Sequence, residues 1–566
     1  MLSSKARNAR ELGIAAGVLL LCMIPLFLAF ARFGYSCGHD IPFHLQSWQD
    51  AASQLRHGIY PQWDITAAHG VGEPRFIFYP PISWLLGAVL SIVVGIPRSA
   101  DAFVIVALLC CGLSMFLSLR RYVGVPVAIA AAVFFALNPY MLFNALERSA
   151  FGELLASAWL PLLAISAIQP RPRVRSIAVP FALLWLTNVP TAIIGSYLLL
   201  GIVCLRLVQG AFLQRDSNAD RGLSRRYLSV CVLGAVLGLL ATGFFLVPAL
   251  HQQHYVQLSA AFSEGLDYKD SFLLRHTPLS SRQVTHSVSW IAAELLGFFA
   301  VGSVAMVYLT KKLGSARNQR LGGLLALIVL AAVVTFLLLP PSSAVWAYAP
   351  ELSVLQFPWR LLGVLAMLCS FLLAMLLDTV ADKRIIPLLT AFVLGWLLAI
   401  SGQRQYWLYP NAPDHEGLSR EQVAAATERR PTNEYTPMGA SNSSLNEADK
   451  GYWIGDQMPH NSSSTSADLQ VQDESEAPQH LQVNLPRPEE LVLNLRNYPS
   501  WEVTANGQHL PVDPRPDGRM SLSLPAGVSS LDVRWHRGVD EIGGLILSLL
   551  AASAIWMISR KEREIN

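Results

Sequence analysis

The chain has 566 residues, of which 53% are hydrophobic and only 14% are charged. This composition excludes an ordinary soluble protein, in which about a quarter of the residues are charged, and indicates an integral membrane protein. The net charge of +3 does not point to nucleic acid as a partner, because the basic residues lie in short clusters beside apolar runs, where they orient a membrane protein.

Apolar runs long enough to cross a bilayer recur along most of the chain. A membrane-spanning helix needs about 20 such residues. Asn188 and Pro190 interrupt one long run, which favours a helical hairpin there. The sequence predicts twelve spans, at 12–32, 101–119, 125–143, 153–169, 176–188, 191–209, 228–248, 289–310, 320–340, 358–378, 385–401 and 541–559.

The apolar run 76–96 is a thirteenth candidate, and the distribution of positive charge decides how it is placed. If this run does not cross and the N-terminus is cytoplasmic, every later basic loop is cytoplasmic too, as membrane proteins favour. If it crosses, all those loops become external. We therefore predict a juxtamembrane or re-entrant helix at 76–96, and a multi-pass protein of the bacterial inner membrane whose large domain is periplasmic.

The predicted domains follow from this topology. A transmembrane domain covers 1–401 and includes a first periplasmic loop at 33–100, and a periplasmic domain covers 402–540. Residues 541–566 form a last transmembrane helix and a cytoplasmic tail. From about residue 479 the sequence alternates polar and apolar residues in short runs, with the hairpin signal Asn506-Gly507 between two of them. This predicts a small β-sandwich-like module.

The first external loop carries the most chemistry. His39, Asp40 and His44 crowd the start of a predicted helix, with Asp40 and His44 four residues apart on one face. A carboxylate just outside the first span can take a proton from an incoming hydroxyl. Asp is also a favoured helix N-cap, so a capping role stays open. The same loop supplies aromatic side chains of the kind that stack on sugars or lie at a bilayer interface, namely Trp48, Trp63 and Tyr79.

Two further external segments carry charge. Glu147, Arg148 and Glu153 follow the third predicted span, and these carboxylates can face the first loop and bind a divalent cation or share acid and base roles. A simple ion pair at a helix end is the alternative. Arg360 begins a span on its external side, where its planar guanidinium suits a lipid phosphate or else extends to the interface. His254 adds a polar group on the same side.

Several motifs together resemble a known group of bacterial membrane proteins. They are GHDIPFHLQSW, GIYPQW, GVGEPRFIFYPP, RSAFGE, QFPWR and NYPSWEV. The set resembles YfhO-like proteins and the group labelled 6-pyruvoyl-tetrahydropterin synthase-related, both similar to the GT-C superfamily of polyprenyl-phosphate-dependent glycosyltransferases. The resemblance covers nearly the whole chain. In place of a tight Asp-x-Asp pair, however, the second loop has Glu147-Arg148 and a separate Glu153.

The resemblance implies a polytopic α-helical membrane protein with a GT-C-like fold, about 12 to 13 transmembrane helices and a small C-terminal periplasmic β-sandwich-like domain. It implies inverting transfer of a sugar from a polyprenyl-phosphate donor to a glycan or lipid acceptor, with Asp40 as the catalytic carboxylate and His39 or His44 orienting it. Glu147, Arg148, Glu153 and Arg360 would bind the substrate. A divalent cation, Mg²⁺ or Mn²⁺, held by Asp40 and Glu153, stays open as a cofactor. The alternatives are a transporter or flippase of lipid-linked sugar and a non-catalytic subunit of a polysaccharide assembly complex.

Overall fold

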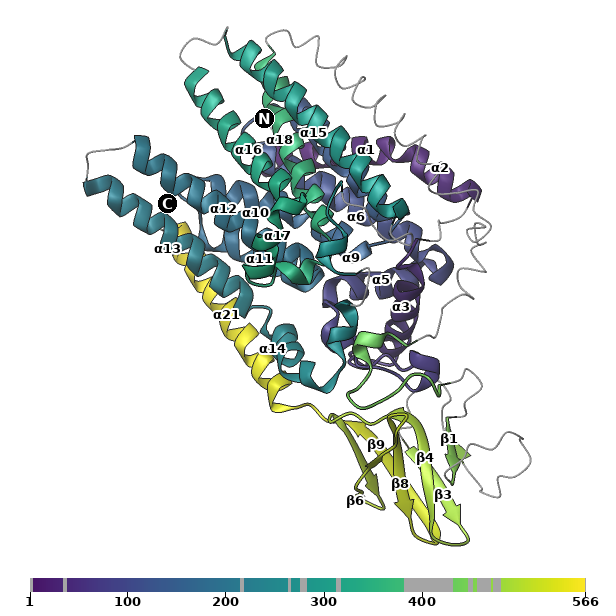
Figure 1. The fold of residues 1–566 in the computed structure, drawn as a ribbon. Coiled ribbons are helices and arrows are strands. Elements are labelled where there is room, and N and C mark those ends of the chain that lie inside the picture. Colours follow the sequence, from purple (N-terminus) through teal and green to yellow (C-terminus); the bar gives the residue numbers. More distant parts are fainter. Residues whose placement is uncertain are drawn as a thin grey trace.

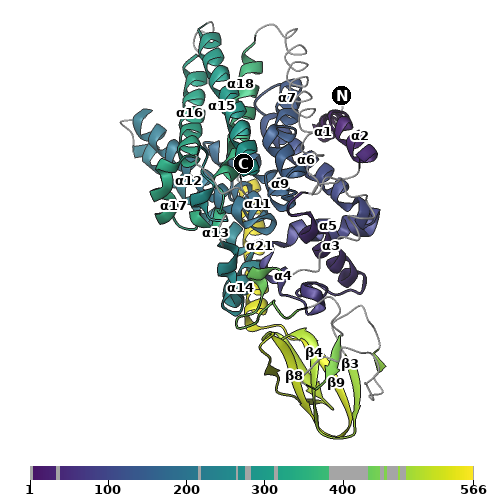
Figure 2. The ribbon, with the colours of Figure 1, turned by 45° about the vertical axis from the view of Figure 1, so that its right-hand side comes forward.

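The protein consists of a large helical body and a smaller body of β-strands at one end of it (Figure 1). A second view shows the same separation (Figure 2). The N- and C-termini lie away from the strands. The computed structural model describes residues 4–33, 38–213, 218–262, 266–274, 282–311, 317–380, 431–445, 451–455, 470–471 and 480–564.

Seven helical segments of the described residues are long and apolar enough to cross a membrane. Two of them contain a break or a preceding 3₁₀ turn. The segments are α6 (Ile96–Leu119), α9 (Phe151–Ala156) continued by α10 (Trp159–Ile168), α12 (Val189–Leu213), α15 (Arg282–Thr310), α16 (Arg317–Leu337), the turn Pro358–Leu361 continued by α18 (Leu362–Thr379), and α21 (Val539–Glu564).

Three bent helix pairs raise the number of candidate spans to as many as ten. α1 (Ser4–Cys22) and α2 (Ile24–Phe33) meet at 46°, and α7 (Val125–Ala136) and α8 (Pro139–Leu146) at 42°. The pair α13 (Asn218–Leu240) and α14 (Gly243–Gln252) bends by 67°. These ten segments coincide with ten of the twelve predicted spans, while predicted span 385–401 lies outside the described residues.

Two apolar helices are too short to cross a bilayer in a straight line. α5 (Pro81–Val94) and α11 (Val174–Thr187) have 14 residues each, or about 21 Å against a hydrocarbon core of about 30 Å. α11 corresponds to the predicted span 176–188, and Asn188 adopts an extended conformation between it and α12, as the predicted hairpin requires. α5 falls in the doubtful run 76–96 and packs against α6 and against α3 (Ile41–Arg56).

The remaining helical elements are short. They are α4 (Arg75–Phe78), α17 (Ser343–Tyr348) and the 3₁₀ turns Ala68–Gly70, Gln253–Tyr255, Leu258–Phe262, Tyr268–Asp270, Pro340–Ser342, Leu352–Leu355 and Asn433–Tyr435.

The C-terminal strands form two antiparallel sheets, one in the order β1-β4-β8-β7 and the other in the order β2-β3-β9-β5-β6. Alternate residues of β3 are buried, as expected for a strand with one face on a core. Asn506 and Gly507 join β5 to β6 with positive φ at both positions, as a type I′ hairpin turn requires. The strands are β1 (Tyr452–Ile454), β2 (Gln470–Val471), β3 (His480–Leu485), β4 (Glu489–Arg496), β5 (Trp501–Ala505), β6 (Gln508–His509), β7 (Asp513–Pro514), β8 (Arg519–Leu524) and β9 (Gly527–Trp535).

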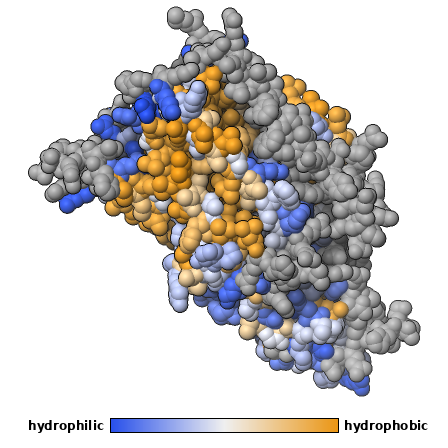
Figure 3. Space-filling view, turned by 45° about the horizontal axis from the view of Figure 1, so that its top comes forward, coloured by the Kyte–Doolittle hydropathy of each residue, from blue (hydrophilic) through white to orange (hydrophobic). Residues whose placement is uncertain are grey.

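The core of these strands extends into the first loop of the helical body. Trp63 is 2% exposed and packs on Tyr498, Trp501 and Trp535, with ring centroids 5.4, 5.8 and 6.0 Å away. The first loop and the β-domain therefore share one apolar cluster. Figure 3 shows a broad apolar surface over the helical body and a mainly hydrophilic one over the β-domain, as a membrane part and a part in water would have.

Candidate functional site

The start of the first loop is fixed against the segment that follows α8. The Asp40 backbone N–H donates to the Arg148 carbonyl at 3.0 Å, and that of His39 to the Glu147 carbonyl at 3.4 Å. Gly38 allows this approach, because a Cβ there would lie only 2.0 Å from the Ser149 Oγ. The structure thus brings together the first two charged segments that the sequence singled out.

Asp40 occupies the N-cap position of α3, yet its side chain makes no capping hydrogen bond. The capping alternative is therefore not realised, and the carboxylate is available for other contacts. Asp40 is half-buried. Burial raises its pKa above the ordinary value, although the positive charges of Arg148, His39 and Arg360 act in the opposite direction. A carboxyl group with a raised pKa is a stronger base than an ordinary carboxylate, as a residue that accepts a proton needs to be.

Glu153 is the centre of a buried polar cluster. It is 5% exposed and accepts hydrogen bonds from Asn144 at 3.1 Å, from Arg148 at 2.8 Å and, at short range, from the Tyr140 hydroxyl. The Arg360 Nε lies 3.3 Å from the same carboxylate. Both Glu153 oxygens are therefore surrounded by donors, as a buried charge requires.

The two arginines of this cluster differ in what they contact. The Arg148 guanidinium also donates to Asn144 at 3.0 Å and lies 4.6 Å from the centre of the Trp359 ring. Arg360 lies over the Phe357 ring at 5.0 Å. Its side chain is only 10% exposed, and its Nη1 has no hydrogen-bond partner within the described part of the chain. Arg360 thus retains donor capacity beside Glu153.

Tyr79 also belongs to this site. Its ring lies 5.2 Å from Phe43 and 6.0 Å from His44, and its hydroxyl lies 3.2 Å from where a Cβ at Gly152 would be. Burial raises the Tyr79 pKa, and the charge of Asp40 acts in the same direction. The phenol is therefore neutral and can donate a hydrogen bond.

His44 and Trp48 have a different place from the predicted one. His44 is 2% exposed and packs on Phe151 at 4.9 Å; burial and the nearby Arg75 lower its pKa to about 3. Its imidazole is neutral at physiological pH and bonds to the backbone of Ser149. Trp48 is fully buried against Phe103 and Phe151. The prediction of a sugar-stacking face at Trp48 is wrong for this structure, because α5 covers the ring at Gly87.

Trp63 and His254 lie at the junction with the β-domain. Trp63 is enclosed in the shared apolar cluster, so it offers no open face to a sugar. His254 is exposed and lies 3.9 Å from the ring of Tyr255, which in turn contacts Tyr498. Within the described residues, the ring contacts of His254 are with His251 and Tyr255 and not with the Asp40 and Glu153 cluster. Of the other predicted residues, Glu147 accepts from the Ser287 hydroxyl at 3.4 Å and His39 is exposed.

The arrangement does not fit a metal ion held by Asp40 and Glu153. A divalent cation needs free carboxylate oxygens, but those of Glu153 face two guanidinium groups, an amide and a phenol. Among the described residues no group of three or more His, Cys, Asp or Glu side chains could hold a metal.

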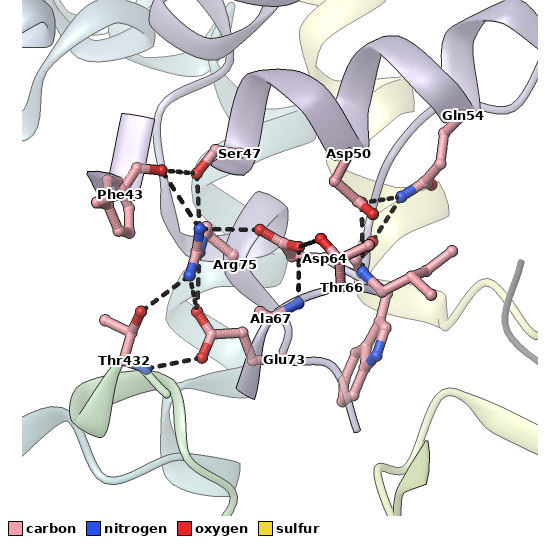
Figure 4. Close-up of polar contacts among 12 residues, drawn as sticks. Phe43, Ser47, Asp50, Gln54, Asp64, Thr66, Ala67, Glu73, Arg75 and Thr432 are labelled. Atoms are coloured by element: carbon pink, nitrogen blue, oxygen red, sulfur yellow. Dashed lines mark hydrogen bonds and ion pairs between the residues drawn. The ribbon is translucent and has the colours of Figure 1, made fainter. Parts of the chain in front are cut away.

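A second buried charge cluster lies in the first loop, and the sequence reasoning missed it (Figure 4). Arg75 is 1% exposed and pairs with Asp64 at 2.9 Å and with Glu73 at 2.7 Å. It also donates to Ser47 at 2.8 Å and to Thr432 at 3.0 Å. The segment GVGEPR contained the signal, a Glu and an Arg two residues apart, but a buried role could not be read from it.

A buried carboxylate pair adjoins Arg75. Asp50 on α3 accepts from Gln54 at 2.6 Å and from the Ile65 N–H at 3.2 Å. Asp64 accepts from the Ala67 N–H at 3.2 Å. Burial raises the pKa of both groups, that of Asp50 also through the charge of Asp64. The first loop is thus held together internally by the ion pairs of Arg75 and the hydrogen bonds of Asp50 and Asp64.

Comparisons with known proteins give a distant structural likeness. No family model matches this chain, and neither does any curated protein. The arabinofuranosyltransferase AftD from Mycobacteria aligns with 71% of this chain and 27% of its own, at 19% identity and a TM-score of 0.40. The archaeal oligosaccharyltransferase AglB from Archaeoglobus fulgidus aligns with 75% and 56%, at 13% identity and a TM-score of 0.36.

This chain therefore spans about a quarter of the first solved chain and about half of the second. Because the identities are low and the TM-scores lie below 0.5, its function has to be argued from its own residues.

Proposed function

We propose that the protein is a membrane glycosyltransferase that moves a sugar from a polyprenyl-phosphate donor to an envelope glycan or lipid acceptor at the periplasmic face of the bacterial inner membrane. The observation that carries the proposal is the convergence of Asp40 with Arg148, Glu153 and Arg360, which come from three distant parts of the chain. A carboxyl group of raised pKa beside an arginine with spare donors matches a base and an anion site. The motif resemblance to YfhO-like proteins and the GT-C superfamily points the same way.

The chemistry balances with these residues. An acceptor hydroxyl attacks the anomeric carbon of the donor, a new carbon–oxygen bond forms, and the bond between that carbon and the phosphate oxygen breaks. Asp40 takes the hydroxyl proton, and polyprenyl phosphate leaves with the bonding electron pair. Arg360 stabilises the charge on the leaving phosphate, so no strong general acid is required. Glu153 acts as a positioning residue, because it holds Arg148 and Arg360.

Asp40→Asn tests the base. We expect sugar transfer to fall by about 10²- to 10⁴-fold, as the loss of a general base does, while the protein keeps its level in the membrane. The measurement is mass spectrometry of envelope glycans and polyprenyl-phosphate sugars in cells that carry the unmodified protein or Asp40→Asn. The donor should accumulate in the Asp40→Asn cells.

Asp513→Asn is the matched control, since Asp513 is exposed in the β-domain. It should transfer sugar like the unmodified protein. Full transfer by Asp40→Asn at a normal membrane level would refute the assigned base and would favour the transporter or the non-catalytic subunit instead.

A further inference from the structure

The end of strand β4 buries an arginine that has few partners. Arg496 is 1% exposed. Its Nη2 donates to the Asn442 Oδ1, but its Nε and Nη1 are buried and have no hydrogen-bond partner within the described chain. The orientation of the Asn442 side-chain amide is fixed, because its Nδ2 donates to Asn433 at 3.0 Å and to Thr436 at 2.9 Å.

No carboxylate of the described residues forms an ion pair with Arg496. Asp517, whose charge acts on Arg496, already accepts from the Arg519 Nη1 and the Arg519 backbone N–H at 2.8 and 2.9 Å. Arg515 lies 3.7 Å from the same carboxylate. In the β4–β8 ladder Arg496 stands opposite Arg519. Asp517 is thus already engaged by Arg515 and Arg519.

This arrangement is costly as it stands. A buried charge that is not paired with a counter-charge opposes folding, and two like charges across a ladder add to the destabilisation. Consistently, burial lowers the Arg496 pKa to about 10; the charge of Arg519 acts in the same direction, and the negative charges of Glu73 and Asp517 offset only part of the shift. A hydrophobic side chain of similar length would fill the same space without this cost.

The cluster also lies at a defined place in the molecule. The Arg496 backbone N–H donates to the Val71 carbonyl of the first loop at 3.1 Å. Arg515 and Asp517 form the outer end of the cluster, with side chains 17% and 12% exposed. Gly518, at φ +82°, closes the turn between them and Arg519, and a Cβ there would come within 3.4 Å of the Arg496 Nη1. The Ala440 Cβ would lie only 2.4 Å from the same position, so the segment that carries Ala440 covers this turn and has to move for a ligand to reach Arg496.

We propose that Arg496, together with Arg515 and Arg519, binds an oxyanion, a phosphate or carboxylate group carried by a ligand of the β-domain. Arginine is the side chain best suited to such groups, because its planar guanidinium offers several directed donors. The free donors of Arg496 supply the inner contacts, and Arg515 supplies the one nearest to water. The proposal does not rest on glycosyl transfer, since a binding domain on a transporter would use the same chemistry.

Thermal unfolding of the full chain in detergent tests this site, with inorganic phosphate and glucuronate as probes and chloride at equal ionic strength as the reference. We expect a saturable rise in the Tm of the unmodified protein of about 2 °C or more with at least one probe. A rise in Tm with phosphate alone identifies the bound group as a phosphate, and a rise with glucuronate alone identifies it as a carboxylate. Arg496→Met should not respond, and Arg487→Met, in the same domain with a side chain 79% exposed, should respond like the unmodified protein.

A measurement without any probe separates binding from a structural role. If Arg496 is kept for a ligand, Arg496→Met should unfold at the same or a higher temperature than the unmodified protein. A lower Tm for Arg496→Met, together with no response of the unmodified protein to either probe, would overturn the proposal. If Arg496→Met does not fold, the response of the unmodified protein decides, and Arg496→Lys should weaken it.

Discussion

Glu153 shows how a single residue can hold a site without reacting in it. Its carboxylate is the anion that two buried arginines share. We predict that Glu153→Gln lowers the free energy of unfolding by about 3–5 kcal/mol, because Arg148 and Arg360 would then be buried without a counter-charge. Thermal and denaturant unfolding in detergent would measure this.

Glu351→Gln is the control, since Glu351 is exposed, and it should change stability by less than about 0.5 kcal/mol. Equal stability of Glu153→Gln and the unmodified protein would show that the arginines do not depend on Glu153.

At this scale the structure places Arg360 beside Glu153 and brings Asp40 near both. The sequence singled these residues out because charged residues next to apolar spans are few and topology places them on one side, and their membership of one functional site stays a prediction. The sequence could not predict that Tyr140 and Asn144 belong to this cluster. They lie on an apolar helix, and only the folded structure shows that they donate hydrogen bonds to Glu153. The catalytic and binding roles themselves stay predictions.

The packing of helix α5 on α3 explains why the prediction for Trp48 was wrong. The ring was expected at a surface because it lies in a polar loop, but α5 packs on α3 and has Gly87 where the ring needs room. We predict that Gly87→Ala destabilises the protein by about 1–3 kcal/mol, since the added methyl would lie 2.0 Å from the indole and overpack this contact. Unfolding in detergent measures the effect.

Gly297→Ala provides the comparison, because nothing lies within 4 Å of a Cβ at that position of α15. Alanine favours a helix over glycine by about 1 kcal/mol, so this variant should be at least as stable as the unmodified protein. A neutral Gly87→Ala would show that α3 and α5 can separate at little cost.

Elements were predictable where the pattern is local. The alternating residues of β3 and the Asn506-Gly507 turn were found as predicted, since each depends on neighbours in sequence. Ten predicted spans match helical segments for the same reason. The bends within three of them were not predicted, because hydropathy measures how apolar a run is and not the direction of its axis.

The pH response belongs to the molecule as a whole. Asp64 has a pKa raised to about 6 in the folded protein, chiefly by burial, against an ordinary value of 3.8. The folded state therefore keeps a proton that the unfolded chain has lost between about pH 4 and 6, so the stability from this group is present below that range and is lost as pH rises through it. Asp50 acts in the same sense, because burial and the charge of Asp64 raise its pKa.

We accordingly predict that the Tm falls as pH rises from about 4 to 6, and that it falls less in Asp50→Asn. A Tm scan over pH in detergent measures both slopes, with Asp513→Asn as a control for an exposed carboxylate. Equal slopes of Tm against pH for Asp50→Asn and the unmodified protein would show that the Asp50 and Asp64 pair does not cause the fall in Tm.

The contact between Arg75 and Thr432 has a consequence for biosynthesis. The two residues are 357 positions apart, and the Asn494 amide that reaches the His69 carbonyl comes 425 positions after it. The ribosome therefore delivers the first loop long before the segments that complete its packing exist. During translation the first loop therefore remains incompletely packed until these segments are synthesised. In a nascent chain stalled before residue 432, proteases should cleave this loop at a site that is buried in the full-length protein.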